Sequence, residues 1–150
     1  MLSSSLEEYL ITIYQMANKG EELKCNEVSK ALNVPLKKTI QAIQRMHYQK
    51  YVVYSPYQPL TITDKGKETA KYLLSRNDLI DEFLDILQIT ENVETEASAM
   101  RQYLSHETLE GIEKFVLFIR QYPEVTNRYK LFMKRNRTKI LEEAPNEEEI

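Results

Sequence analysis

The chain has 150 residues, of which 42% are hydrophobic and 29% are charged, and this composition is typical of a globular protein. No apolar run is long enough to span a bilayer, and the N-terminal residues lack the basic and apolar segments of a signal peptide. We therefore expect no membrane association and a cytoplasmic location. A single cysteine, Cys25, excludes an internal disulfide and a clustered-thiolate metal site.

Charge is distributed unevenly along the chain, although the total is only −3. Residues 1–75 hold 10 Lys and Arg against 7 Asp and Glu, a net of +3, whereas residues 76–150 hold 10 against 16, a net of −6. A basic first half and an acidic second half suit a chain that presents one end to phosphates. Chance segregation would explain the same pattern, so it carries little weight alone.

Apolar residues at helical spacing predict a first helix, which Ser5 and Glu8 begin as a capping box and which ends at Gly20. Asn26 is expected to cap a short second helix. The sequence Asn33-Val34-Pro35 should end that helix, because proline cannot continue it. Two helices joined by a tight turn are therefore expected before the next element.

A third helix is predicted from Leu36 to Tyr48. At about 100° per residue, its apolar residues fall on one side and a polar, basic row falls on the other. Solvated helices also carry Lys and Gln, so this row is ambiguous by itself. The outward row consists of Lys37, Gln41, Gln44, Arg45 and Tyr48, with Lys38 at its edge.

β-branched and aromatic residues predict two short strands, at residues 51–54 and 60–62, joined by a proline-containing turn. Thr63 should then cap a long helix that continues to Leu87. Helix-turn-helix, hairpin and helix in this order form a winged helix-turn-helix. The outward row then holds the residue types that read base edges and contact phosphates in a major groove, so double-stranded DNA is the expected partner.

The long helix is apolar on more than one stripe near its end, and such a helix needs burial on two sides. One side is the core of the chain, and the other is expected to be a second copy. The predicted fold is mainly α, with a winged helix-turn-helix domain over residues 1–74 and a helical dimerisation domain with a charged C-terminal end over residues 75–150. The predicted homodimer interface consists of Leu79, Ile80, Phe83, Leu84 and Leu87.

The stretch Leu6-Glu7-Glu8-Tyr9-Leu10, the turn through Val34 and the spacing of Tyr54, Tyr57, Thr63 and Gly66 resemble the DtxR/MntR family of bacterial metal-dependent regulators. The resemblance covers residues 5–120 and favours the shorter, manganese-type members without an SH3-like domain. It implies a homodimeric repressor that binds a palindromic operator under the control of Mn(II) or Fe(II). On the DNA face it implies Lys37, Lys38, Ile40, Gln41, Gln44 and, in the wing, Tyr57.

Most of the metal ligands that the resemblance implies are replaced in this chain. Only Glu8 keeps a ligand type, and one carboxylate beside a guanidinium does not suit Mn(II) or Fe(II). No metal site is therefore predicted. Instead, a Glu8–Arg101 ion pair is a hypothesis for the bridge between the two domains, with two unrelated surface charges as its alternative. The replaced positions are Ile11, Asn77, Ser98, Arg101 and Gln102.

An enzyme is not expected, because the chain shows no nucleophile with a base, no phosphate-binding glycine loop and no paired carboxylates of a recognisable cleft. His47 is expected to pack rather than to bind a ligand. Three alternatives stay open. The chain could be an ordinary Mn(II)- or Fe(II)-activated repressor with non-standard ligands, a winged-helix regulator controlled by a small organic effector, or a winged domain that binds only protein.

Overall fold

The computed structural model describes residues 2–136, and the remaining C-terminal residues of the predicted second domain lie outside the described part. The described chain is mostly helical, with one short antiparallel hairpin, so the predicted mainly α fold with a winged helix-turn-helix followed by a helical part is confirmed. The elements are α1 (Ser4–Asn18), α2 (Cys25–Leu32), α3 (Leu36–Tyr48), β1 (Val52–Val53), β2 (Thr61–Ile62), α4 (Asp64–Ile86), α5 (Val93–Tyr103), α6 (His106–Gln121) and α7 (Pro123–Arg135).

The first core lies between α1, α2, α3, the hairpin and the first half of α4. Its fully buried side chains include Leu10, Ile13, Val28, Ile43 and Met46. None of the helices in residues 2–136 is long and apolar enough to cross a membrane.

Two of the predicted helix caps are wrong. α1 begins at Ser4, after an N-cap at Ser3 that makes no side-chain capping bond, because the buried Leu2 fixes the chain one step earlier than expected. α2 begins at Cys25, so Asn26 lies inside its first turn.

The predicted cap at Thr63 is confirmed. Its hydroxyl accepts a hydrogen bond of 3.0 Å from the backbone N–H of Gly66. The same hydroxyl lies 2.7 Å from the carbonyl oxygen of Lys50, which ties the hairpin to the start of α4. In the hairpin, Val52 pairs with Ile62 and Val53 with Thr61.

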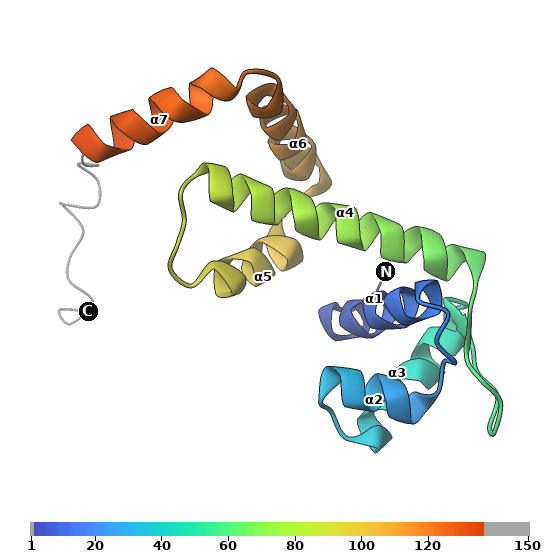
Figure 1. Ribbon diagram of the computed structural model, residues 1–150. Coiled ribbons are helices and arrows are strands. Elements are labelled where there is room, and N and C mark those ends of the chain that lie inside the picture. Colours follow the sequence, from blue (N-terminus) through green and yellow to red (C-terminus); the bar gives the residue numbers. More distant parts are fainter. Residues whose placement is uncertain (1, 137–150) are drawn as a thin grey trace.

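α4 connects the two halves of the molecule. Its first half contributes Ala70 and Leu73 to the first core, and its second half runs between α5 on one side and α6 on the other (Figure 1). Ile80 and Leu84 pack with Ala97 of α5, whereas Ile86 packs with residues of α6.

The sequence analysis expected a second copy to cover one side of Leu79–Leu87, and this reason for placing the dimer interface there is partly wrong. Ile80 and Leu84 are buried by α5 of the same chain, because α4 is covered on both sides without a second copy. Leu79 and Phe83 pack against the α6 cluster, and the Phe83 ring meets the Phe115 ring edge-on at 6.0 Å between centroids. Leu87 is half-buried.

The uncovered apolar surface lies instead on the outer side of α6 and on α7. α7 extends from the end of α6, at the end of the molecule opposite to the winged part (Figure 1). None of its residues is buried. The exposed large apolar side chains of these two helices are Phe115, Leu117, Phe118, Tyr122, Leu131, Phe132 and Met133.

Candidate DNA interface and interdomain cleft

The turn between α2 and α3 holds the candidate recognition helix in place. Asn33 adopts a left-handed conformation (φ 53°), and the Ser29 hydroxyl donates a 2.6 Å hydrogen bond to the carbonyl of Val34. Thr39, Ile43 and Met46 are completely buried on the inner side of α3. Because these three side chains fix the rotation of the helix, its opposite side must face solvent.

The side chains that the sequence assigns to DNA lie on that open side. Lys37, Lys38, Gln41, Gln44 and Arg45 are exposed, and Ile40 is half-buried at the edge of the row. None of the three cations takes part in a salt bridge among residues 2–136, so their charges are available to phosphates. Tyr48, which the sequence places on the same side but which is not among the predicted DNA-binding residues, is 89% exposed at the end of the helix.

The wing is fixed to the recognition helix by a side chain to which the sequence gave another role. His47 is exposed rather than packed, and its Nδ1 accepts a 3.1 Å hydrogen bond from the backbone N–H of Tyr54. Tyr57, at the tip of the hairpin, has a fully exposed side chain and a positive φ of 65°. The wing therefore presents an exposed aromatic side chain at its tip.

A cleft of about 530 Å³ lies where the two halves meet. It brings together five of the six positions at which the resemblance implies metal ligands, from α1, α4 and α5. They are Glu8, Ile11, Asn77, Ser98 and Arg101, whereas Gln102 is exposed on α5 outside the lining.

The hypothesis of a Glu8–Arg101 ion pair is wrong. Arg101 instead donates a 2.7 Å hydrogen bond to Glu94, two turns earlier on its own helix. Because Glu94 and Arg101 both lie on α5, this contact does not cross the cleft. Glu8 forms no salt bridge within residues 2–136.

The ion pair that joins the two halves is Glu7–Arg76. The Arg76 guanidinium donates to both carboxylate oxygens of Glu7, at 2.9 and 3.4 Å. The side chains are 9% (Arg76) and 19% (Glu7) exposed, so the pair is largely removed from solvent. The sequence carries no signal for it beyond two ordinary charges, because only the packing of α1 against α4 brings them together.

The donors in the cleft do not fit a Mn(II) or Fe(II) site. Glu7 is occupied by Arg76, and the Asn77 oxygen accepts hydrogen bonds from the same guanidinium. Arg101 adds a second fixed positive charge to the lining. Among residues 2–136, no group of three or more His, Cys, Asp and Glu side chains is placed to hold a metal ion.

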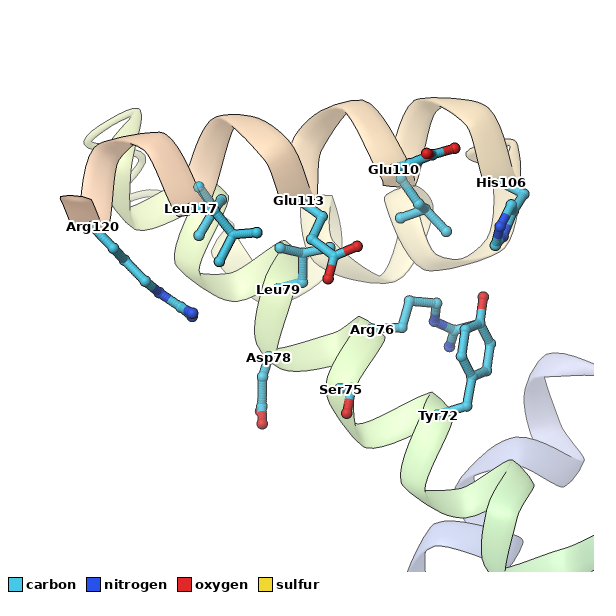
Figure 2. A pocket seen from close by; sticks show the side chains of 12 residues that line it. Tyr72, Ser75, Arg76, Asp78, Leu79, His106, Glu110, Glu113, Leu117 and Arg120 are labelled. Atoms are coloured by element: carbon cyan, nitrogen blue, oxygen red, sulfur yellow. The ribbon is translucent and has the colours of Figure 1, made fainter. Parts of the chain in front are cut away.

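A second cavity, of about 460 Å³, lies between α4 and α6. Figure 2 shows Tyr72, Arg76 and Leu79 on α4 across from His106, Glu113 and Leu117 on α6. Its mixed polar and apolar lining and its size are those of small-molecule sites.

An ion pair between the same two helices lies beside this cavity. Arg120 of α6 donates to both carboxylate oxygens of Glu82 of α4, with 2.7 Å from Nε to Oε1. The hydrogen bonds from Arg120 are the main cause that holds the pKa of Glu82 below its usual value, against a smaller opposing effect of burial.

Two family profiles match the chain. The profile described as "Iron dependent repressor, N-terminal DNA binding domain" matches residues 1–60. The profile described as "Iron dependent repressor, metal binding and dimerisation domain" matches residues 63–130. The first match contains the recognition helix, the first strand of the wing and its turn, and the second contains the α4 residues of both cavities together with the α5 residues of the cleft and the α6 residues of the second cavity.

Individual relatives agree with these profiles. The HTH-type transcriptional regulator MntR of Bacillus pumilus (strain SAFR-032) is 26% identical over 137 residues, which cover 91% of this chain and 95% of MntR. The structure of the manganese regulator SloR has a TM-score of 0.67 at 21% identity, over 78% of this chain and 55% of the SloR chain. The protein SSo2273 from Sulfolobus solfataricus has a TM-score of 0.63 at 19% identity, over 77% of this chain and 89% of its own. This chain therefore spans about half the length of SloR, and the two structures support the fold alone.

Proposed function

We propose that this chain, which belongs to the DtxR/MntR family of metal-dependent transcriptional regulators, binds a palindromic DNA operator as a homodimer and represses transcription there. Members of this family are regulators and not enzymes. The observation that carries the proposal is the row of exposed, unpaired cations and amides on α3, held in position by three buried side chains on the other face. One such helix per subunit would occupy one half-site.

The domain boundary that we propose lies within α4, after residue 74. Leu73 is the last residue of α4 in the first core, and Ile80 is the first one fully buried against α5. The helix spans the boundary without interruption, so it would carry the DNA-binding domain directly on the dimerisation domain.

The homodimer is supported by α7. Isolated helices of about this length are marginal in water unless an apolar face is packed. α7 buries no residue within the chain, although Leu131, Phe132 and Met133 are apolar. Together with Phe118 of α6, they form an exposed surface of the kind that marks an interface. We propose this surface, with Leu79 and Phe83 at its base, as the contact with a second copy.

We further propose that operator binding does not require Mn(II) or Fe(II). The support is the donor set of the interdomain cleft, where two guanidiniums and an amide oxygen stand beside the remaining carboxylates. A dication would meet these positive charges at short range, and the two cleft carboxylates without an arginine partner among residues 2–136 are Glu8 and Asp81.

The test is a binding titration on purified full-length protein. Duplexes are first selected from a random pool, once with excess chelator and once with Mn(II), and the selected duplex is then titrated in chelator, Mn(II) and Fe(II). The expected result is one palindromic duplex with the same affinity in all three conditions. A stoichiometric metal that raises operator affinity would return the protein to ordinary metal activation with non-standard ligands.

A second candidate is control by a small organic effector. It is favoured by the cavity between α4 and α6, because a ligand there would touch Arg76 and both helices of the dimerisation domain. Thermal-shift screening of small metabolites, with Leu117→Trp as a variant that fills the cavity, separates this candidate from an effector-free regulator.

A further inference from the structure

The Glu7–Arg76 pair lies between the first core and the buried cluster that α4 forms with α5. Glu7 is in the first turn of α1, next to the buried Leu6, and Arg76 is in the middle of α4. Along α4, Arg76 follows Leu73, which belongs to the first core. It precedes Ile80, which belongs to the cluster between α4 and α5. The pair therefore joins the start of the DNA-binding domain to the helix that enters the dimerisation domain.

Asn77 fixes the direction in which the guanidinium points. Its side-chain oxygen accepts from Arg76 Nε at 3.3 Å and from a terminal nitrogen at 3.1 Å. The remaining donors face Glu7, so all three guanidinium nitrogens have an acceptor in this network. Asn77 occupies one of the positions at which the resemblance implies a metal ligand, and here it orients a cation that belongs to the chain.

A buried ion pair is a poor source of stability, because the cost of desolvating two charges offsets most of their attraction. An arginine–carboxylate pair instead constrains geometry, because the planar guanidinium aligns with the carboxylate in one bidentate orientation. An apolar pair of the same size would add to the packing of α1 on α4 without this directional constraint. The residue types thus indicate that the relative position of α1 and α4 matters.

We propose that the Glu7–Arg76–Asn77 network is a permanent link that fixes α1 on α4 and thereby sets the separation of the two recognition helices without a metal ion. This inference rests on the proposed function, because it assigns Arg76 as the positioning residue of a dimeric DNA-binding protein. The link consists of side chains of the chain itself, so it needs no cation from solution.

The neighbouring pair Glu94–Arg101 provides a matched control. It lines the same cleft and has a comparable 2.7 Å hydrogen bond, but both residues lie on α5. It cannot join the two domains. Glu94 is also 82% exposed, so its loss leaves no buried charge.

The first experiment compares Glu7→Gln, Arg76→Met, the double variant, and Arg101→Met as control, on the duplex selected above and in excess chelator. Each single variant of the link should weaken operator binding about tenfold or more, and the double variant should be no weaker than the singles, because all remove the same interaction. Arg101→Met should bind like the wild type. Arg76→Lys keeps the charge but loses the fork, and it should fall between wild type and Arg76→Met.

The second experiment measures geometry directly and does not depend on DNA. Spin labels are attached through Lys30→Cys in a Cys25→Ser background, and the distance between the two labels of the dimer is measured in chelator. The wild-type link should give one narrow distribution, and the double variant should give a broad one while its helical content is unchanged. The double variant leaves no unpaired buried charge, so it is informative even if a single variant unfolds.

The two proposals fail in different ways. Wild-type protein that selects no duplex would overturn the proposed function, whereas the label distances would still test the link. Operator binding by the wild type together with unchanged affinity and unchanged distances in the double variant would overturn the link and leave the function standing.

Discussion

Gln41 and Gln44 end in amides that offer one donor and one acceptor side by side, which is the pairing that adenine presents in the major groove. Gln41→Ala or Gln44→Ala should therefore reduce discrimination against the wrong base at one position by about 1–3 kcal/mol. The measurement is the affinity for the selected duplex and for duplexes with single base-pair changes. Equal discrimination in both variants and the wild type would contradict a role in base readout.

Lys37 and Lys38 should act on all sequences alike. Replacing either by Ala removes a phosphate contact, which should lower the salt dependence of binding by about one unit of slope and weaken specific and non-specific duplexes equally. Lys30→Ala is the matched control, because Lys30 is equally exposed but lies on α2 and pairs with Glu27 at 3.6 Å. An unchanged salt dependence in Lys37→Ala and Lys38→Ala would show that these two lysines do not contact phosphates.

Gly66 is required by the close approach of two segments. A Cβ at this position would lie 2.1 Å from the carbonyl oxygen of Tyr51 and 2.9 Å from a side-chain carbon of Ile62. Gly66→Ala should destabilise the protein by about 3 kcal/mol or more, because a backbone carbonyl cannot move aside easily. The control is Gly111→Ala on α6, where nothing lies within 4 Å of the added carbon and where the better helix propensity should stabilise the fold by roughly 0.5–1 kcal/mol. Chemical denaturation of both variants decides the comparison.

Between elements, the Glu82–Arg120 pair ties α4 to α6, and its contribution should depend on pH. Arg120 lowers the pKa of Glu82 in the folded chain, so the folded chain binds fewer protons than the unfolded chain in the acid range. The contribution is therefore complete at neutral pH and is lost as the pH falls through the usual glutamate range and below. Both side chains are partly exposed, so the effect should be small.

The corresponding experiment compares melting temperatures of the wild type and Glu82→Gln at neutral pH and in acid. The variant should melt lower at about pH 7, and the difference should shrink as the pH falls through the usual glutamate range and below, because the Glu82 carboxyl then becomes protonated and uncharged. Glu113→Gln, which alters another carboxylate beside the same cavity, should show no such difference at neutral pH. A difference that persists in acid would assign the effect to packing rather than charge.

Periodicity in the sequence predicts the elements well and their contacts poorly. The bounds of α3 and the extent of α4 follow from the spacing of buried residues and from Thr63, whose hydroxyl caps α4. The helix starts near Ser5 and Asn26 do not follow: Leu2 is buried and Cys25 is half-buried against the first core, and both helices begin without a side-chain cap.

Partners across the cleft were out of reach for a similar reason. Glu7 and Glu8 are adjacent, and only the rotation of α1 decides which of them faces Arg76. Position in the family pattern selected Glu8 and Arg101, because those positions gather around one cleft. The side chains in that cleft nevertheless choose the nearest opposite charge, which for Arg101 is Glu94 on its own helix. The place of the site was predictable and the pairing within it was not.

At the scale of the whole molecule, α4 is the uninterrupted helix that connects the DNA-binding part to the dimerisation part. The winged part packs on its first half, α5 and α6 cover its second half, and α7 lies at the far end (Figure 1). In a dimer related by a two-fold axis near α6 and α7, the two recognition helices would be separated by twice this reach. If the chain dimerises as proposed, a small rotation between α1 and α4 would change the separation of the two recognition helices, and the proposed role of the link at Arg76 is to prevent it.

The position of the proposed dimer interface can be tested by two substitutions that introduce a charge. One lies on the exposed face of α6, and the other lies on the side of α4 that packs against α5. Phe118→Glu puts a carboxylate on the exposed face of α6, so it should yield folded monomers with strongly reduced operator affinity, because each half-site supplies only part of the contacts. Leu84→Glu puts the same charge into a site only 5% exposed within the chain, and it should instead unfold the helical half. Sedimentation velocity and circular dichroism distinguish the two outcomes. A folded monomer from Leu84→Glu, with Phe118→Glu still dimeric, would move the interface back to the α4 segment first predicted from the sequence, and a monomeric wild type at micromolar concentration would exclude a homodimer altogether.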